Sequence, residues 1–137
     1  MKARIEWAGG MRFIGGTENG QGIVMEASKL ENAHRVGASP MEVVLVGMGG
    51  CSSYDVVHIL KKMRQSIKHV WCDMEATRAD AVPAVFTKVH MAFTVVGDVP
   101  IEKAEEAVRL SVEKYCSVSR MIGSTAKITT EVKIEAE

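Results

Sequence analysis

Hydrophobic and polar residues alternate in several stretches of this chain, and alternation with period two is the pattern of a strand with one buried face. From Lys2 to Trp7, for example, charged and apolar residues take turns. The glycine-rich stretch 15–20 is a predicted turn, so the chain opens with a β-meander. The fourth and fifth strands are predicted to pair as a hairpin around residues 79–83. In all, strands are predicted over residues 2–7, 11–14, 22–27, 67–76, 85–96 and 127–136.

The stretch from Met41 to Met63 is predicted to be a long helix. Ser39 and Glu42 have the spacing of a capping box, and Pro40 suits the first helical position. Apolar residues surround this helix instead of lining one stripe, so we expect it to be central and buried. The polar stretch 28–37 that precedes it is predicted to be a loop.

A second, amphipathic helix is predicted from Ile101 to Val112, ending near Cys116, and a short helical or turn segment follows it up to Gly123. The order βββ-α-ββ-α-β predicts an α+β fold, with about six strands in antiparallel sheets around the long helix. A chain of 137 residues makes one domain, so we expect residues 1–137 to be a single domain. Because a helix that is apolar all round needs cover on both sides, we also expect a homodimer.

The charges of the chain balance, with 17 Lys and Arg against 17 Asp and Glu. A neutral chain has no general electrostatic attraction for nucleic acid or for an anionic membrane. The first residues lack the apolar region of a signal peptide, and no apolar stretch approaches the roughly 20 residues that cross a bilayer. We therefore expect a cytoplasmic protein with no nucleic-acid or membrane partner.

The three cysteines are an odd number, so they cannot all pair within the chain, and in a cytoplasmic protein they are expected to be thiols. Cys51 follows Gly47, Gly49 and Gly50 on the long helix, where each glycine costs about 0.8–1.0 kcal/mol relative to alanine. The glycines indicate a close approach, either by another backbone or by a substrate that reaches the thiol. A lone helical cysteine is more often a small buried hydrophobe.

Asp55 and His58 follow Cys51 on nearly the same stripe of the helix. Asp55 nearest the sulfur would oppose the thiolate, and His58 is two turns away, so a Cys-Asp-His nucleophile is not favoured. We expect a structural Asp55–His58 pair instead. The spacing of these residues matches no common zinc pattern, and neither a metal nor a cofactor is expected.

Cys116 lies at the end of the second helix, whereas Cys72 lies in a predicted strand and is expected to be a packing residue. Cys51 and Cys116 could act as a peroxidatic and a resolving cysteine, in which a thiolate attacks peroxide and the sulfenic acid condenses with the second thiol. The residues by themselves permit this chemistry without requiring it.

The sequence SPMEVVLVGMGGC at 39–51, followed by KYCSVSR at 114–120, resembles the family of osmotically inducible protein C and organic hydroperoxide resistance proteins (OsmC/Ohr). The resemblance implies an intertwined homodimer with two active sites at the interface. It also implies that each site reduces organic or inorganic hydroperoxides, with attack by Cys51 and disulfide closure with Cys116. An external dithiol would then reduce the disulfide.

The chain departs from the family pattern next to Pro40. In the family an acidic residue follows this proline and joins an N-terminal arginine beside the thiolate, whereas here Met41 follows and the acid is Glu42. On a straight helix Glu42 is about 180° around from Cys51 and roughly 13–14 Å away, so it cannot serve that thiol. Arg12 is our candidate for the arginine that stabilises the thiolate, and Arg4 and Arg35 are alternatives.

A second function from another class is a dimeric binding protein without catalysis, or with redox-sensing cysteines. Met41, Met48 and Met121 would then line an interface pocket for a small hydrophobic ligand. Methionine commonly fills gaps in cores, so the same residues are also compatible with plain packing.

Overall fold

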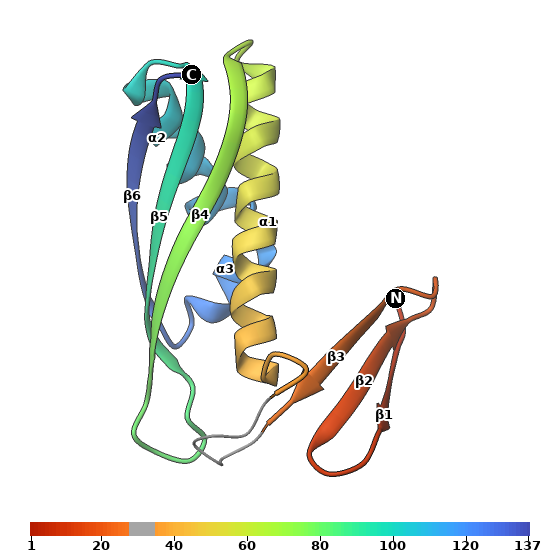
Figure 1. The fold of residues 1–137 in the computed structure, drawn as a ribbon. Helices are drawn as coiled ribbons and strands as arrows, with labels where there is room; N and C mark the ends of the chain where they lie inside the picture. The colour runs from red at the N-terminus through yellow and green to blue at the C-terminus, as the bar shows by residue number, and fades with distance from the viewer. Residues whose placement is uncertain (28–34) are drawn as a thin grey trace. The chain divides into compact units, whose positions relative to one another are not determined.

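The computed structural model describes residues 1–27 and 35–137, so most of the predicted loop 28–37 lies outside the described residues. The chain divides into two compact units, residues 1–46 and 47–137, which are described in turn (Figure 1). The six strands are β1 (Ala3–Trp7), β2 (Arg12–Thr17), β3 (Gly22–Glu26), β4 (Ser66–Arg78), β5 (Phe86–Asp98) and β6 (Lys127–Glu135). The helices are α1 (Pro40–Lys62), α2 (Ile101–Leu110), the π-helical turn η1 (Ser111–Tyr115) and α3 (Ser117–Ile122). The predicted element order and α+β class are confirmed.

The N-terminal unit contains the predicted meander, an antiparallel sheet in the order β1-β2-β3. Strand β2 is longer than predicted, because Gly15 and Gly16 pair within the sheet instead of forming the turn. A Cβ atom on Gly15 would lie 3.3 Å from Cε of Met25, so the strand is close-packed at this point. The turn itself lies further on and contains Gly20, whose φ of 89° favours glycine.

Helix α1 begins with the predicted capping box. The backbone N–H of Ser39 donates to Oε2 of Glu42 at 2.6 Å, and the backbone N–H of Glu42 donates to Oγ of Ser39 at 3.3 Å. Arg35 adds a bidentate ion pair to the same carboxylate at 3.1 and 3.2 Å. The Ser39 amide first, and then Arg35, lower the pKa of Glu42 from 4.5 to about 2.

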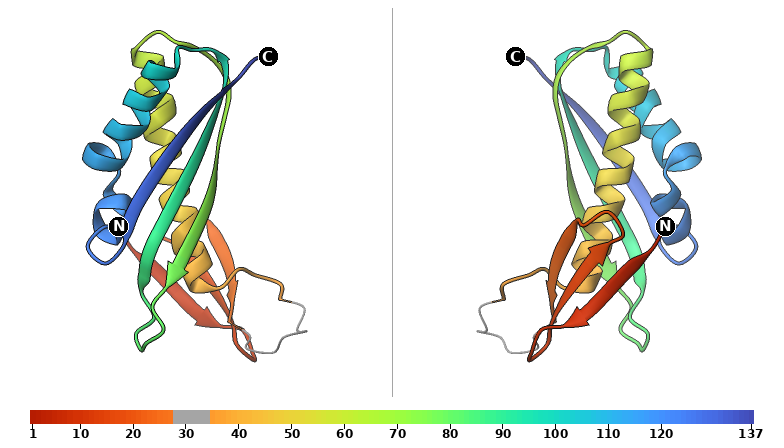
Figure 2. Two further views of the ribbon diagram at one scale, coloured as in Figure 1. Left: turned by 90° about the vertical axis from the view of Figure 1, so that its left-hand side faces the viewer. Right: turned by 90° about the vertical axis from the view of Figure 1, so that its right-hand side faces the viewer.

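The C-terminal unit is a three-stranded sheet in the order β4-β5-β6, with α2, α3 and the part of α1 from Gly47 onward on one face of it (Figures 1 and 2). β4 and β5 form the predicted antiparallel hairpin, but β6 pairs with β5 in parallel, so the prediction of purely antiparallel sheets is wrong for this pair. A parallel partner needs a long crossover, and here α2, η1 and α3 supply it. The core of this unit includes Val56, Leu60, Val89, Met91, Phe93, Val95, Ala104 and Val108.

Only one face of α1 is buried on the single chain. Met48, Gly49, Ser52, Val56, Ile59 and Leu60 are its buried residues. Val46 and Tyr54, in contrast, are each 70% exposed. The expectation that the helix is buried all round is therefore not met by one chain, and these two side chains remain exposed.

Helix α1 is also long and apolar enough, by length and composition alone, to cross a membrane. The sequence-based expectation that no stretch approaches this limit was wrong. However, Val56 and Leu60 are fully buried in the core of the C-terminal unit. The core helix of a soluble protein passes the same test, so length and composition alone do not assign a membrane span to α1.

We predict that Glu42→Gln lowers the melting temperature at neutral pH, because the amide carries no charge for Arg35 and is a weaker acceptor for the Ser39 amide. The depressed pKa of Glu42 makes its stabilisation complete above about pH 4.5 and progressively weaker as the pH falls toward 2. The difference between wild type and variant should therefore shrink on acidification. Thermal unfolding followed by circular dichroism, from neutral pH to about pH 3, measures this.

Glu105→Gln, which removes an exposed carboxylate from α2, serves as the control for a general charge effect. A gap between wild type and Glu42→Gln that is constant across the pH range would contradict the assigned cause.

Candidate active site

The site is built around two cysteines that are far apart in the sequence. Cys51 lies on α1, and Cys116 lies between η1 and α3. The two sulfur atoms and a carboxylate oxygen of Asp55 all lie within 4.8 Å of one another, and both thiols are free. The structure thus brings together the two cysteines singled out from the sequence.

The π-helical turn η1 and the start of α3 hold Cys116 in place. The backbone N–H of Cys116 donates to the carbonyl oxygen of Ser111 at 2.8 Å, and Cys116 is the N-cap residue of α3. Its Sγ accepts hydrogen bonds from the backbone N–H of Ser119 at 3.3 Å and from the hydroxyl of Ser52 at 3.2 Å. A thiol therefore occupies the position that serine, threonine, aspartate or asparagine usually takes.

Three buried serines surround this contact. Ser52 and Ser119 share a hydrogen bond of 3.1 Å between their hydroxyls, and the hydroxyl of Ser111 donates to the carbonyl oxygen of Ser52 at 3.0 Å. Each serine is at most 2% exposed. This network was not predicted, although Ser111, a polar residue within the predicted amphipathic helix from Ile101 to Val112, was a signal for it.

The two thiols differ in their tendency to ionise. Burial is the largest influence on Cys116 and raises its pKa, but the hydrogen bonds from Ser119 and Ser52 outweigh it and hold the pKa below its ordinary value of 9.0. Burial also comes first for Cys51, and together with the neighbouring Cys116 it raises the pKa of Cys51 despite the backbone amide of Val118. The main influences on the pKa of Cys51 are thus burial, two backbone amides and the second thiol.

The two thiols also differ in access. Cys51 is half-buried, whereas Cys116 is only 2% exposed. A solute that approaches from solvent therefore reaches Cys51 first. Of the glycines before it, Gly49 is the close-packed one: a Cβ atom there would lie 2.6 Å from Sδ of Met74 on β4, so the Met74 side chain would have to move.

The predicted Asp55–His58 pair is wrong. The ring of His58 stacks on Tyr54 one turn earlier, with ring centroids 6.0 Å apart, and the Oδ2 atom of Asp55 takes no hydrogen bond from it in the described part of the chain. Asp55 faces the sulfurs instead. Its Oδ2 atom is buried and has no hydrogen-bond partner among the residues that the structure describes.

The candidate arginines lie in the N-terminal unit, and each has a carboxylate partner there. Arg12 pairs with Glu26 at 3.5 Å, Arg4 with Glu6 at 3.0 Å, and Arg35 with the capping carboxylate of α1. The Nε atom of Arg12 is buried without a hydrogen-bond partner within residues 1–27 and 35–137. Which of these arginines serves Cys51 stays a prediction.

Cys72 lies outside the cluster, on β4, where burial first and Asp73 second raise its pKa to about 12. Of the methionines proposed to line a ligand pocket, Met48 is fully buried in the core and Met121 is 65% exposed. Met48 therefore has a packing role in the core, and the pocket at a dimer interface stays a prediction.

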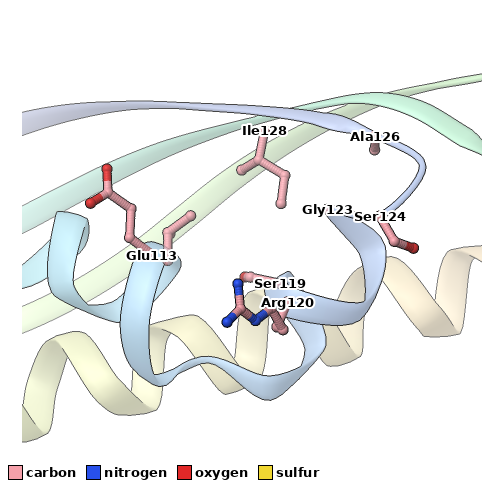
Figure 3. Close-up of a pocket in the computed structure, with 8 residues that line it drawn as sticks. Glu113, Ser119, Arg120, Gly123, Ser124, Ala126 and Ile128 are labelled. Carbon is pink, nitrogen blue, oxygen red and sulfur yellow. The ribbon is translucent and has the colours of Figure 1, made fainter.

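An open cavity of about 540 Å³ adjoins the serine network, between η1, α3 and the start of β6 (Figure 3). Ser119 and the charged residues Glu113 and Arg120 are among those that line it. The cavity therefore lies beside the segment that carries Cys116, although Ser119 itself is buried.

Comparison with known proteins identifies relatives over the whole length. A family model for OsmC-like protein matches residues 31–131. Protein YhfA of Escherichia coli (strain K12) is 37% identical over 137 residues, which is 99% of each chain.

Two solved structures share the fold. An OsmC-like protein from Mycoplasma pneumoniae superposes with a TM-score of 0.83 at 12% identity, covering 97% of this chain and 95% of that one. The organic hydroperoxide resistance protein OhrB of Bacillus subtilis superposes with a TM-score of 0.70 at 18% identity, covering 97% and 98%.

We predict that Ser52→Ala lowers the free energy of unfolding by about 1–3 kcal/mol, because it removes a donor from Cys116 and the partner of the buried Ser119 hydroxyl. Urea denaturation of the reduced protein at one protein concentration measures this. Ser53→Ala, at the next position on α1, is the matched control and should change stability by no more than about 0.5 kcal/mol. Equal losses in the two variants would show that the network does not stabilise the fold.

Proposed function

The chain belongs to the family of OsmC-like proteins, and on this basis we propose that it is a thiol-dependent peroxidase that reduces organic or inorganic hydroperoxides. The observation that carries the proposal is the proximity of the Cys51 and Cys116 sulfurs, within 4.8 Å of each other. A sulfenic acid at one of them needs only a short movement to form a disulfide, in which the sulfurs are about 2.05 Å apart.

The reaction divides into two steps. The Cys51 thiolate attacks one oxygen of the hydroperoxide, the S–O bond forms as the O–O bond breaks, and the leaving alkoxide takes a proton to give the alcohol. The Cys116 thiolate then attacks the sulfur of the Cys51 sulfenic acid, the S–S bond forms, and the hydroxyl leaves as water with one proton. Two electrons pass from the two thiols to the peroxide.

The difference between the thiols supports this assignment. Cys51 is more exposed than Cys116, and the cysteine that attacks the peroxide has to be reached by it from solvent. Cys116 is buried, and its hydrogen bonds from Ser52 and Ser119 favour the thiolate that the second step uses. These bonds also fix its sulfur close to Cys51.

The first step needs a cation at Cys51, because burial opposes its ionisation. We assign this cation to Arg12, following the family resemblance. The net charge of the chain is zero, so no general positive field replaces a placed arginine.

The exposed apolar side chains Val46 and Tyr54 of α1 support the proposal of a homodimer. The disulfide of each turnover has to be reduced by an external dithiol, which is consistent with a cytoplasmic location.

We predict that one equivalent of cumene hydroperoxide converts the reduced protein to a form with one Cys51–Cys116 disulfide per chain. Thiol counting and peptide mapping by mass spectrometry measure this. Cys116→Ser should stop at a sulfenic acid on Cys51 that dimedone traps, because the resolving sulfur is absent. Cys72→Ser is the matched control and should react like the wild type.

The peroxidase proposal fails if no Cys51–Cys116 bond forms, or if Cys51→Ser consumes peroxide as fast as the wild type.

We predict that Arg12→Gln slows oxidation of Cys51 by cumene hydroperoxide at least about tenfold at neutral pH, because an opposite charge nearby favours the thiolate by one pKa unit or more. Stopped-flow measurement of peroxide-dependent thiol loss gives the rate constant. Arg4→Gln and Arg35→Gln are matched controls that should leave this rate within about twofold of wild type. A slow Arg35→Gln or Arg4→Gln beside a normal Arg12→Gln would reassign the cation.

A further inference from the structure

Two thiols and a carboxylate converge in the C-terminal unit, and peroxide chemistry uses only the thiols. Cys51 and Asp55 lie one helical turn apart on α1, and Cys116 completes the group from the start of α3. From this cluster we propose that the reduced protein binds one Zn²⁺ ion per chain through Cys51, Asp55 and Cys116. The helical trio considered from the sequence had His58 as third member, and the structure places Cys116 there instead.

The spacing of the three ligand atoms suits zinc. Zn–S bonds of about 2.3 Å in a tetrahedron place two sulfurs about 3.8 Å apart, and Zn–O bonds of about 2.0–2.2 Å bring a carboxylate oxygen slightly closer. The three atoms already lie within 4.8 Å of one another, so binding needs them to approach by at most about 1 Å.

The donor set also selects the class of metal. Mg²⁺ and Ca²⁺ are bound through oxygen ligands, whereas thiolates favour zinc and other thiophilic ions. Iron–sulfur clusters need four ligands of mainly cysteine type, and the described cluster has two cysteines. Three protein ligands leave the fourth tetrahedral position for water, as in an open zinc site.

Asp55 provides an observation that is independent of the cysteines. Its buried Oδ2 atom has no hydrogen-bond partner among the residues that the structure describes, and a buried carboxylate oxygen without a partner is costly. A bound cation would satisfy it. Asp55 also lines a cavity of about 400 Å³ with His58, Lys62 and Tyr115, so the carboxylate side of the cluster borders an open space.

The surroundings of Cys116 supply two hydrogen-bond donors to its sulfur, as suits a metal-bound thiolate. The Ser52 hydroxyl and the Ser119 amide donate to its sulfur and can stay in place when the sulfur binds a metal. Such hydrogen bonds from outside the ligand shell orient a ligand and tune its metal. Because zinc and a disulfide require the same two sulfurs, each excludes the other, and zinc loading depends on the thiols being reduced.

The test is titration of the reduced, full-length protein with Zn²⁺ in competition with a chromophoric chelator. We expect one ion per chain in the wild type, at least about a hundredfold weaker binding in Cys51→Ser and Cys116→Ser, and at least about tenfold weaker binding in Asp55→Asn. Cys72→Ser is the matched control and should bind like the wild type. Co²⁺ gives a second measurement, since thiolate-to-cobalt charge-transfer bands should appear in the wild type and weaken in each cysteine variant of the cluster.

The zinc site is excluded if the wild type binds less than one ion per chain, if Cys72→Ser weakens binding as much as Cys51→Ser, or if Asp55→Asn binds like the wild type. These outcomes do not depend on the peroxide reaction. Wild-type zinc binding without peroxide reduction would remove the proposed function only, and peroxide reduction without zinc binding would remove the metal site only.

Discussion

The hydrogen bonds of Ser52 join helix α1 to the segment that carries Cys116. Its hydroxyl donates to the Cys116 sulfur, and its carbonyl oxygen accepts from Ser111. Both contacts are buried, where an unpaired polar group costs free energy, so the two segments are held in one relative position. The separation of the two sulfurs, the position of Asp55 beside them and the low exposure of Cys116 all depend on this connection.

Thiol chemistry requires access to the substrate and stabilisation of the thiolate, and in this site the two requirements are met at different cysteines. Cys51 has access to solvent, but burial raises its pKa, whereas Cys116 has stabilising donors but little access. A peroxidase built in this way is limited at its first step by whatever supplies the positive charge. A metal ion would meet the same need differently, because it neutralises both sulfurs at once.

Sequence patterns predicted the elements whose signals are local. The capping box of Ser39 and Glu42 and the β4–β5 hairpin are both present, because their partners are close in sequence. The parallel pairing of β6 was missed, since alternation reports which residues face the core and not which strand lies alongside.

The site was predicted only in part, because sequence patterns do not report which distant segments of the chain lie together. The resemblance to a family singled out Cys51 and Cys116, but the inward direction of Asp55 and the serine network depend on how α1 meets α3. Glycine also misled the prediction in β2, where Gly15 serves tight packing within a strand and not a turn.

The parallel strand β6 has a consequence for the order in which the site is assembled. Cys116 lies within the crossover between β5 and β6, and this crossover is closed only when residues 127–135 pair with β5. These residues follow Cys116 in the chain, so the crossover cannot close before they too have been synthesised. Pairing of β6 therefore closes the segment that holds Cys116 beside Cys51 only after both cysteines are already part of the chain.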